Sequence, residues 1–552
     1  MTDTTQPVHL SVEGMTCDHC EITVGKALNR AGLEDPRVDW RTGSAVGLPT
    51  LEFSTERAVE ELKAVGYRLA AAEEPASGTK TSPESAEPAE HDLLIIGSGS
   101  AAFAAAITAS ELGARVAIVE AGTVGGTCVN IGCVPSKALL RAAEQYHSAA
   151  HSPFAGVPTA VGVVDLPALV AQKDGLVAAM RQEKYEDLIG MYGIELIRGK
   201  ARFTGPDTVE VDGKEMRAGR ILIATGATPW APPIEGLEQT DYLTSTTALA
   251  LTELPGDLIV VGANAIGLEL GQLFMHLGSR VTFIEALDRI APFEELEISA
   301  ALQAHLESQG ARVLTSATVT KAGANGGRRW LDVTIDGAAE WMETDQLLLA
   351  TGRRANTAGL GLDAAGVETD LRGHVVVDEQ MTTANPKVFA AGDVTSLPQF
   401  VYVAAVSGSV AAENALRGTS RRIDLRTMPR VTFTSPPFAA VGLTEAEARD
   451  AGHQVVTSVL PLDVVPRALV DYATTGLMKL VADEADGRLL GAHILAPGAG
   501  DVIQAAVMAL RYGATIDDIT DIFHPYLTMA EGLKLAAQGF SKDVRYLSCC
   551  AA

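Results

Sequence analysis

Two stretches of this chain repeat one another, and this repeat constrains the fold more than any other feature. Residues 92–121 read DLLIIGSGSAAFAAAITASELGARVAIVEA, and residues 257–286 read DLIVVGANAIGLELGQLFMHLGSRVTFIEA; the two align without a gap. Each stretch is an apolar segment, a glycine-containing turn, a helical segment and a second apolar segment that ends near a glutamate. This order is typical of the βαβ unit of a dinucleotide-binding fold. The sequence therefore predicts two such folds in one chain.

The first repeat carries the residues that bind a dinucleotide. Gly97, Gly99 and Ala102 form a G-x-G-x-x-A pattern between the predicted strand and helix. Gly97 permits the tight turn, and Gly99 lets a pyrophosphate approach the backbone, where the helix N-terminus stabilises its charge. Glu120 closes the next strand, where an acidic side chain binds ribose hydroxyls. We therefore predict a dinucleotide site here.

The second repeat departs from this pattern. It keeps Gly262 and Gly267 but has Asn264 at the middle position, so ordinary packing remains an alternative explanation for it. Glu285 would repel the 2′-phosphate of NADPH and suits the free hydroxyl of NADH. The prediction is NADH, although the nearby Arg289 leaves NADPH open.

Length and charge limit the classes of protein that fit. A chain of 552 residues, 47% of them hydrophobic, is expected to form three or four domains. A net charge of −26 argues against binding to nucleic acids or anionic membranes. The sequence shows no apolar run of the ~18–20 residues that a membrane span needs, and the first residues, MTDTTQPVHL, do not resemble a secretory signal. We expect a cytoplasmic protein without membrane insertion.

A compositional change separates a small N-terminal module from the rest. Residues 71–91 are rich in Ala, Glu, Pro, Ser and Thr, which predicts a flexible linker. Before it, VHLSVEGM alternates apolar and polar residues, a helical period begins after Cys20, strand-like segments follow around 44–53, and TERAVEELKAVG is again helical before YRLAAA. The order β-α-β-β-α-β predicts a ferredoxin-like, split-βαβ domain at residues 1–70.

The six cysteines fall into three close pairs, and none is left over. In a reducing cytosol such pairs indicate metal binding or redox catalysis rather than structural disulfides. The pair two residues from the end of the chain is adjacent, so its disulfide would be strained, and a chain end is where order is weakest. The pairs are Cys17 with Cys20, Cys128 with Cys133, and Cys549 with Cys550.

The segment GGTCVNIGCVPSK at 125–137 is the most specific motif of the chain. Cys128 and Cys133 lead into the helical stretch ALLRAAEQY, and a helix N-terminus lowers the pKa of a thiol and raises its thiolate fraction. A metal site of the usual kind would need two further ligands nearby. We predict a redox-active cysteine pair.

Together with ATG at 224–226, ATGR at 350–353 and FAAGDV at 389–394, this motif resembles the flavin-dependent disulfide reductases, a family that includes glutathione reductase, dihydrolipoamide dehydrogenase and mercuric reductase. The resemblance covers residues 92–548. It implies an α/β chain with two Rossmann-like domains, FAD in the first and a nicotinamide in the second, and an α+β domain that forms a homodimer. The expected domains are FAD-binding at 92–240 and 359–423, NAD(P)-binding at 241–358, and dimerisation with the Cys-Cys tail at 424–552.

The resemblance also implies roles for single residues. Asp393 would bond the ribityl chain of FAD, and Lys137 would form an ion pair with Glu269 beside the flavin. Further positions that the family motifs place at the cofactors are Gly126, Thr127, Thr225, Gly226 and Gly352.

One position separates the branches of this family. Members that reduce organic disulfides have a His-Pro-Thr-x-x-Glu segment whose His is the acid/base. Counting back from Glu531 puts Tyr526 at that position, with His524 two residues early as an alternative base. A tyrosine with its ordinary pKa of about 10 is a poor base at neutral pH. We therefore expect an enzyme that is not built for thiol–disulfide exchange.

The stretch HPYLTMAEGLKLAAQ with the Cys-Cys end resembles the mercuric reductase branch, and GMTCDHC at 14–20 resembles heavy-metal-associated domains. Soft cations prefer thiolate ligands. The resemblance implies reduction of Hg(II) to Hg(0) with electrons from NAD(P)H through FAD, for mercury detoxification. Tyr185 and Tyr526 would line the inner site, although a purely structural Tyr185 fits equally well.

In this interpretation the three cysteine pairs act in sequence on Hg(II). Cys17 and Cys20 acquire the ion, with handover from small thiols or mercury carriers. Cys549 and Cys550 of the partner subunit pass it on, so that the active sites are shared in the dimer. Cys128 and Cys133 hold it for reduction.

Two alternatives remain at this stage. A dihydrolipoamide dehydrogenase-like disulfide reductase is favoured by Glu285 and by the sequence VTFIEALDRI. The other alternative is a metal carrier at residues 1–70 attached to a regulatory remainder of the chain. The intact thiol motif at 125–137 argues against it.

Overall fold

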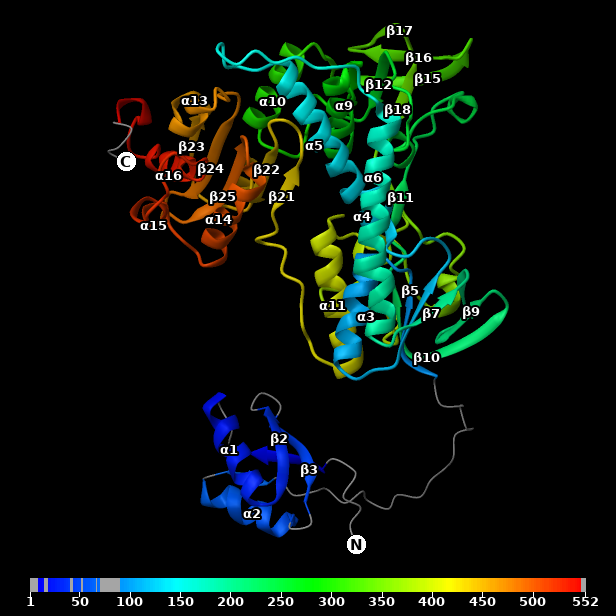
Figure 1. The fold of residues 1–552 in the computed structure, drawn as a ribbon, viewed down its shortest axis with the longest axis vertical. Helices are drawn as coiled ribbons and strands as arrows, with labels where there is room; N and C mark the ends of the chain where they lie inside the picture. The colour runs from blue at the N-terminus through cyan, green and yellow to red at the C-terminus, as the bar shows by residue number, and fades with distance from the viewer. Residues whose placement is uncertain are drawn as a thin grey trace. The chain divides into compact units, whose positions relative to one another are not determined.

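The computed structural model describes residues 8–13, 18–39, 43–50, 53–65, 67–69 and 90–547. The chain divides into two compact units, Met1–Glu87 and Pro88–Ala552 (Figure 1). Each unit has its own hydrophobic core, and each is described by itself.

The small unit is a four-stranded antiparallel sheet of order β2-β3-β1-β4 with two helices, and its core includes Val24, Leu28 and Leu62. This confirms the predicted β-α-β-β-α-β order. The elements are β1 (Val8–Glu13), α1 (Asp18–Arg30), β2 (Leu33–Asp39), β3 (Ser44–Pro49), α2 (Thr55–Ala64) and β4 (Arg68–Leu69).

Two predicted boundaries in this unit are wrong. Helix α1 begins at Asp18, so the backbone of Cys20 lies in its first turn rather than before it. The sequence predicts the strand-like segments around 44–53. The structure has one strand there, β3, and places the other, β2, earlier at Leu33–Asp39. The pairing of β2 with β3 shifts register between Glu34 and Arg37, and such an irregularity breaks the alternation that identifies a strand in sequence.

The first repeat lies in a mixed sheet at the start of the larger unit. Its parallel part has the order β7-β6-β5-β10, with β20 paired to β10, and the hairpin strands β9 and β8 extend it beyond β10. Helices α3 (Ser100–Glu111) and α11 (Val401–Arg417) pack side by side on this sheet (Figure 1). The strands are β5 (His91–Ile96), β6 (Val116–Glu120), β7 (Glu195–Arg198), β8 (Ala201–Gly205), β9 (Thr208–Val211), β10 (Lys214–Ile223) and β20 (Val388–Ala390).

The second repeat lies in a parallel sheet of order β14-β13-β12-β18, next to a small antiparallel sheet, β15-β16-β17. Both repeats are therefore βαβ units, as predicted from the sequence. The parallel strands are β12 (Asp257–Val261), β13 (Arg280–Ile284), β14 (Arg312–Leu314) and β18 (Gln346–Leu349), with helices α9 (Ala265–Leu277) and α10 (Leu296–Ser308). The small sheet has β15 (Ala317–Asn325), β16 (Arg328–Ile335) and β17 (Ala338–Thr344).

The C-terminal part is an antiparallel sheet of order β21-β22-β25-β24-β23 with helices against it, which confirms the predicted α+β domain. The Nζ atom of the buried Lys479 on β24 donates to Glu295 Oε2 and to Glu445 Oε2, both at 2.9 Å. The bond to Glu295 connects β24 to the start of α10. The elements are β21 (Arg430–Thr432), β22 (Phe438–Gly442), β23 (Val455–Pro461), β24 (Leu477–Asp483), β25 (Leu489–Leu495), α14 (Ala499–Arg511), α15 (Ile516–Asp521) and α16 (Glu531–Gln538).

Three helices connect the first fold to the second. The thiol motif forms α4 (Gly126–Ile131) and the start of α5 (Cys133–Ala150), so this helix begins five residues before the predicted stretch ALLRAAEQY. Helix α5 packs against α9 of the second repeat and against α6 (Leu166–Arg181). No helix in the described residues is long and apolar enough to cross a membrane.

Candidate active site

The two glycine turns need glycine for the same reason. Gly97 has φ +107° and Gly262 has φ +96°, in the region that side chains rarely adopt. A Cβ at these positions would lie 2.4 Å from the carbonyl oxygen of Ala224 and 2.5 Å from that of Ala350. Each turn therefore lies tightly against the end of a neighbouring strand and leads into a helix N-terminus, the arrangement that receives a pyrophosphate.

In the first repeat, an acidic side chain is fixed against this turn. The carboxylate of Glu120 accepts hydrogen bonds from Ser98 Oγ and from the backbone N–H of Gly122, both at 2.5 Å. Its position at the end of β6 is the one at which an acid binds ribose hydroxyls. Gly99 is the residue before α3 and Ala102 lies in its first turn, directly after the glycine turn.

The second repeat places its acid in the same way. Glu285 is buried and accepts hydrogen bonds from the backbone N–H groups of Ala263, at 2.8 Å, and Leu287, at 3.0 Å. Asn264 is the residue before α9, in the place that Gly99 takes before α3, and Gly267 packs against the carbonyl of Gly262. The backbone turn is thus kept although its middle glycine is not.

The redox motif places two free thiols at the start of a helix. Cys128 is half-buried in α4, and Cys133 is the first residue of α5 and exposed. A hydrogen bond from the Cys128 thiol, helped by the charge of Lys137, lowers the pKa of Cys133 to about 7. The same hydrogen bond and burial raise the pKa of Cys128. One thiolate and one thiol therefore coexist near neutral pH.

Helix α4 lies directly on the first glycine turn. A Cβ on Gly126 would lie 2.6 Å from the Cα of Gly99, so no side chain fits between the two segments. The side-chain amide of Asn130 donates to the carbonyls of Val124 and Gly126, both at 2.9 Å, and holds this loop in shape. Thr127 follows Gly126 in the same first turn. The thiols are therefore fixed next to the first dinucleotide site.

An ion pair joins the thiol helix to the second repeat. Lys137 Nζ on α5 lies 2.6 Å from Oε2 of the buried Glu269 on α9. The other oxygen of Glu269 accepts from the backbone N–H of Phe433 at 2.9 Å, and Lys137 Nζ lies 4.7 Å from the centre of the Phe433 ring. The lysine is thus held between a carboxylate and an aromatic face.

Tyr185 lies near the thiols. It is half-buried on a π-helical turn, Gln182–Glu186, and its ring packs edge-on against Phe103 at a centroid distance of 4.9 Å. Burial raises the pKa of its hydroxyl, and the sulfurs of Cys128 and Cys133 add to this effect. Such single π-helical turns inside helices often occur at functional sites.

The remaining predicted flavin contacts lie on loops that meet at the end of the first sheet. Asp393 is half-buried on the short helix Gly392–Val394, and burial raises the pKa of its carboxyl. Arg353 follows Gly352, and its Nε lies 3.9 Å from Asp393 Oδ2 with no hydrogen-bond partner among the described residues. Thr225 and Gly226 bond to Asn356 of the same group of loops.

These observations fit a bound FAD. The glycine turn and the Gly99–Gly126 contact leave bare backbone for a pyrophosphate. Glu120 provides an acceptor for the ribose, Asp393 provides a half-buried carboxyl, and Arg353 provides a buried Nε that has no hydrogen-bond partner among the described residues.

The predicted acid/base segment lies on the loop between α15 and α16. Glu531 is buried, and its Oε2 accepts from the backbone N–H of Leu527 at 3.3 Å. The His524 ring, on the loop after α15, bonds to the carbonyl of Ile519 in that helix at 3.0 Å and not to Glu531. Tyr526 is 48% exposed on this loop.

Some predicted metal ligands lie outside the described residues: Cys17, Cys549 and Cys550, and the side chain of Cys20. Across the ranges that the structure describes, no three His, Cys, Asp or Glu side chains are grouped to hold a metal ion.

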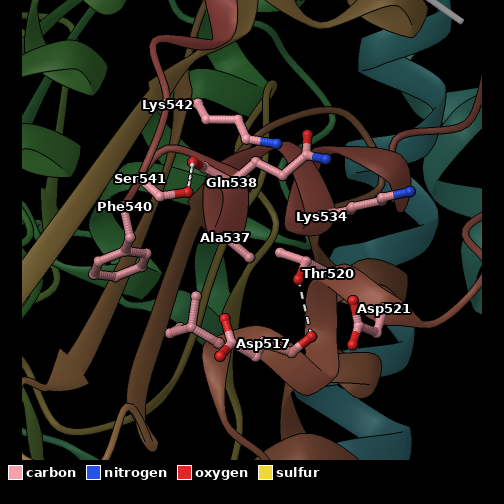
Figure 2. A pocket seen from close by; sticks show the side chains of 10 residues that line it. Asp517, Thr520, Asp521, Lys534, Ala537, Gln538, Phe540, Ser541 and Lys542 are labelled. Atoms are coloured by element: carbon pink, nitrogen blue, oxygen red, sulfur yellow. Dashed lines mark hydrogen bonds between the residues drawn. The ribbon is translucent and has the colours of Figure 1, made fainter. Parts of the chain in front are cut away.

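Two surface pockets lie away from this site. One, of about 380 Å³, opens between α15 and α16. In it, Thr520 and Ser541 bond to carbonyls of their own segments, and charged side chains line the rim (Figure 2). The other, of about 460 Å³, lies between Arg289 and Arg449. Neither contains the thiols, so neither is the candidate site.

Three residues of the site were missed by sequence reasoning. Arg353 lies inside the ATGR motif and could have been found there. Asn130 lies between the two cysteines, but its role depends on the local helix geometry. Phe433 lies far along the chain from Lys137 and is brought to it only by the fold.

The geometry predicts how the thiol pair responds to pH. In the reduced enzyme, alkylation of Cys133 by iodoacetamide should follow a titration with a midpoint near 7, because only the thiolate reacts and its pKa is lowered to about 7. The rate rises as pH increases through this value. Lys137→Met should raise the midpoint by about one pH unit, because the cation no longer stabilises the thiolate.

Arg141→Met is the matched control, since Arg141 lies one turn further along α5 and pairs with Glu144 on the surface. It should leave the midpoint unchanged. A midpoint near the ordinary thiol value of about 8.5 in the unmodified protein would contradict the prediction.

Comparison with known proteins agrees with this geometry. The sequence model of the pyridine nucleotide-disulphide oxidoreductases matches residues 91–408, and that of their dimerisation domain matches residues 428–537, which supports the predicted homodimer. The chain is 50% identical over 542 residues to a mercuric reductase of Staphylococcus aureus, with 98% of each covered, and 42% identical over 553 residues to one of Acidithiobacillus ferrooxidans, with 99% of each covered.

Solved structures resemble the same part of the chain. The flavoprotein disulfide reductase RclA of Escherichia coli superposes with a TM-score of 0.73 at 31% identity, covering 81% of this chain and 99% of that one. LpdA of Mycobacterium tuberculosis superposes with a TM-score of 0.72 at 26% identity, with the same shares covered. The family implies FAD and a nicotinamide as cofactors. This chain belongs to the pyridine nucleotide-disulphide oxidoreductase family.

Proposed function

We propose that this chain is a mercury(II) reductase, which reduces thiolate-bound Hg(II) to Hg(0) with electrons from NAD(P)H through FAD. The named relatives from Staphylococcus aureus and Acidithiobacillus ferrooxidans are mercuric reductases, and their matches cover 98–99% of this chain and of each relative. Mercury detoxification is the corresponding role.

The observation that carries this proposal is a redox thiol pair whose expected acid/base partner is absent. Among the described residues, Glu531 bonds to a backbone N–H and His524 to a backbone carbonyl, so no histidine is paired with this glutamate. Exchange with an organic disulfide needs a proton donor for the leaving thiolate. A soft metal ion needs only two sulfurs and leaves without taking a proton, which is what Cys128 and Cys133 provide.

The residues around the thiols perform the binding steps. The Cys133 thiolate, present near neutral pH, displaces one thiolate ligand of the incoming Hg(II). Cys128 then binds the metal as its second sulfur, and its proton passes to the second ligand thiolate as that ligand leaves. Lys137 keeps a positive charge next to the developing pair of thiolates. Bound FAD supplies the two-electron link between the nicotinamide and the metal ion. The product Hg(0) carries no charge to hold it between the sulfurs and is released.

We propose NADH as the preferred nicotinamide. Glu285 is fixed with its carboxylate on the second glycine turn, where it suits a free ribose hydroxyl and repels a 2′-phosphate. The guanidinium of Arg289 donates to the carbonyl of Pro292 at 2.7 Å and contacts Asp288. The arginine is thus partly engaged within its own loop, so kcat/KM should be higher with NADH than with NADPH.

Steady-state kinetics of the purified flavoprotein test the function. Hg(II) with excess small thiol should stimulate NADH oxidation strongly, and NADPH oxidation less. Lipoamide and glutathione disulfide should be reduced slowly, because the acid/base histidine is missing. Rapid turnover of lipoamide with little response to Hg(II) would instead favour the dihydrolipoamide dehydrogenase-like alternative.

We further propose that the other cysteine pairs deliver the substrate. Cys17 and Cys20 would capture Hg(II), from small thiols or from mercury carriers, and Cys549 and Cys550 would pass it to the active site of the partner subunit. Each transfer exchanges one pair of sulfur ligands for another, so that no free ion is released. Tyr185 and Tyr526 would line the inner site during this exchange.

Replacing both terminal cysteines tests the last handover. Cys549→Ala with Cys550→Ala should lower Hg(II) turnover at least about tenfold, a loss of 1.4 kcal/mol or more in transition-state stabilisation. Flavin reduction by NADH should remain unchanged, since the nicotinamide site is not altered. Ser548→Ala is the control in the same segment and should have no effect. Unchanged Hg(II) turnover in the double variant would rule out a delivery role for the tail.

Removing residues 1–90 separates the enzyme from the carrier alternative. The larger unit has its own core, so the shortened chain should keep its thermal midpoint and its turnover at ample Hg(II). The capture role predicts a loss only when Hg(II) is scarce or competed by small thiols. Complete loss of turnover at ample substrate would instead favour the carrier alternative.

A further inference from the structure

Four of the eleven histidines of the chain meet at the junction between the thiol helix and the second dinucleotide fold. His147 and His151 lie near the C-terminal end of α5, His276 lies on α9 and His305 on α10. The His147 ring stacks on His276 at a centroid distance of 4.1 Å and on His151 at 4.3 Å. These four residues form what we call the histidine cluster.

The cluster is one end of the interface between α5 and α9. The other end is the Lys137–Glu269 ion pair. From this pair to the contact of His147 with His276, the residue numbers rise along both helices. His305 adds a third helix, and its ring bonds to the carbonyl of Ser435 in the C-terminal domain at 3.0 Å. The cluster thus joins three parts of the larger unit.

Burial disfavours a positive charge on the rings and outweighs the two groups that would stabilise one, the carbonyl of Ser435 at His305 and the side chain of Gln309 at His276. His276 is only 5% exposed, and its Nε2 has no hydrogen-bond partner among the described residues. His147 contacts the uncharged Gln309 of the segment after α10. Two carboxylates close to the cluster in sequence, Glu144 on α5 and Glu307 on α10, accept hydrogen bonds from Arg141 and Gln303. The charged groups that act on the rings of His147 and His276 are other histidines of the cluster.

We propose that the histidine cluster is an acid-sensitive clasp, which holds the thiol helix to the second dinucleotide fold while its rings are neutral and opens when they are protonated. Two stacked rings at about 4 Å cannot both carry a charge in a partly buried site without strong repulsion. In the closed arrangement at most one ring of the stacked pair can therefore be protonated, whereas separation of the two helices at this end lets both rings bind protons. Acid therefore favours the open arrangement.

The direction of the pH dependence follows from burial. Burial lowers the pKa of His147, His276 and His305, for His276 to about 3, and the neighbouring histidines lower the pKa of His147 and His276 further. The unfolded or opened state has the ordinary value of about 6.5, so it binds more protons. The clasp is therefore fully closed above about pH 6.5, and its contribution to stability is lost as pH falls below that value.

Hydrogen exchange of the full-length flavoprotein tests this. Between pH 7.5 and 5.5, after correction for the intrinsic rate, peptides covering residues 140–151 and 272–277 should exchange roughly tenfold faster or more at the lower pH. His147→Phe with His276→Phe keeps two stacked rings that cannot be charged, and it should abolish this acid response. His453→Gln is the control, because His453 lies against Asp483 outside the cluster, and it should leave the response unchanged.

Equal protection at both pH values in the unmodified protein would overturn the proposal, and so would an acid response that persists in the double variant. Should that variant fail to fold, exchange of the ring C2 hydrogens in the unmodified flavoprotein decides the question. His147, His276 and His305 should then titrate below the ordinary value of about 6.5. Titration of these rings at or above that value would also overturn it.

Discussion

The arrangement of the larger unit depends on the ion pair between Lys137 and Glu269. Each partner comes from a different dinucleotide fold, and the carboxylate is buried. Breaking such a pair leaves an uncompensated charge, which typically costs about 3–5 kcal/mol. Because Phe433 bonds to the same carboxylate through its backbone, the C-terminal domain is held at the same point. One interaction therefore fixes the thiols relative to both cofactor folds and to the domain that forms the dimer.

The larger features were predictable because each has a local chemical cause. The two glycine turns, the acids that follow them and the thiols before α5 are all read from short segments, and the structure places them where βαβ geometry requires. Strand β2 was missed because its register shift removes the alternation of a regular strand. Phe433, the Ser435 contact to His305 and the stacking of His147 on His276 join residues that are more than 125 positions apart. No local sequence pattern predicts such contacts, because they form only when the domains pack against one another.

The architecture that this chain shares with RclA and LpdA explains why its fold alone does not select a substrate. Both folds and the thiol pair serve electron transfer in general, and they are compatible with organic disulfides and metal ions alike. In our proposal the distinction lies in a short loop, where Tyr526 stands five residues before the buried Glu531, which bonds to the backbone. In this proposal a few loop residues decide which substrate the shared scaffold serves.

Glu285 also has a structural role, and this role limits how mutation can change the choice between NADH and NADPH. Its two oxygens accept the backbone N–H groups of Ala263 and Leu287, so any replacement that cannot accept would leave two amides unpaired, at about 1–3 kcal/mol for each buried donor. The glycine turn would lose its support together with the ribose ligand. Selection for a phosphorylated nicotinamide therefore has an easier route through residues such as Arg289, whose bonds lie within its own loop. The carboxylate therefore supports the glycine turn whichever nicotinamide the enzyme takes.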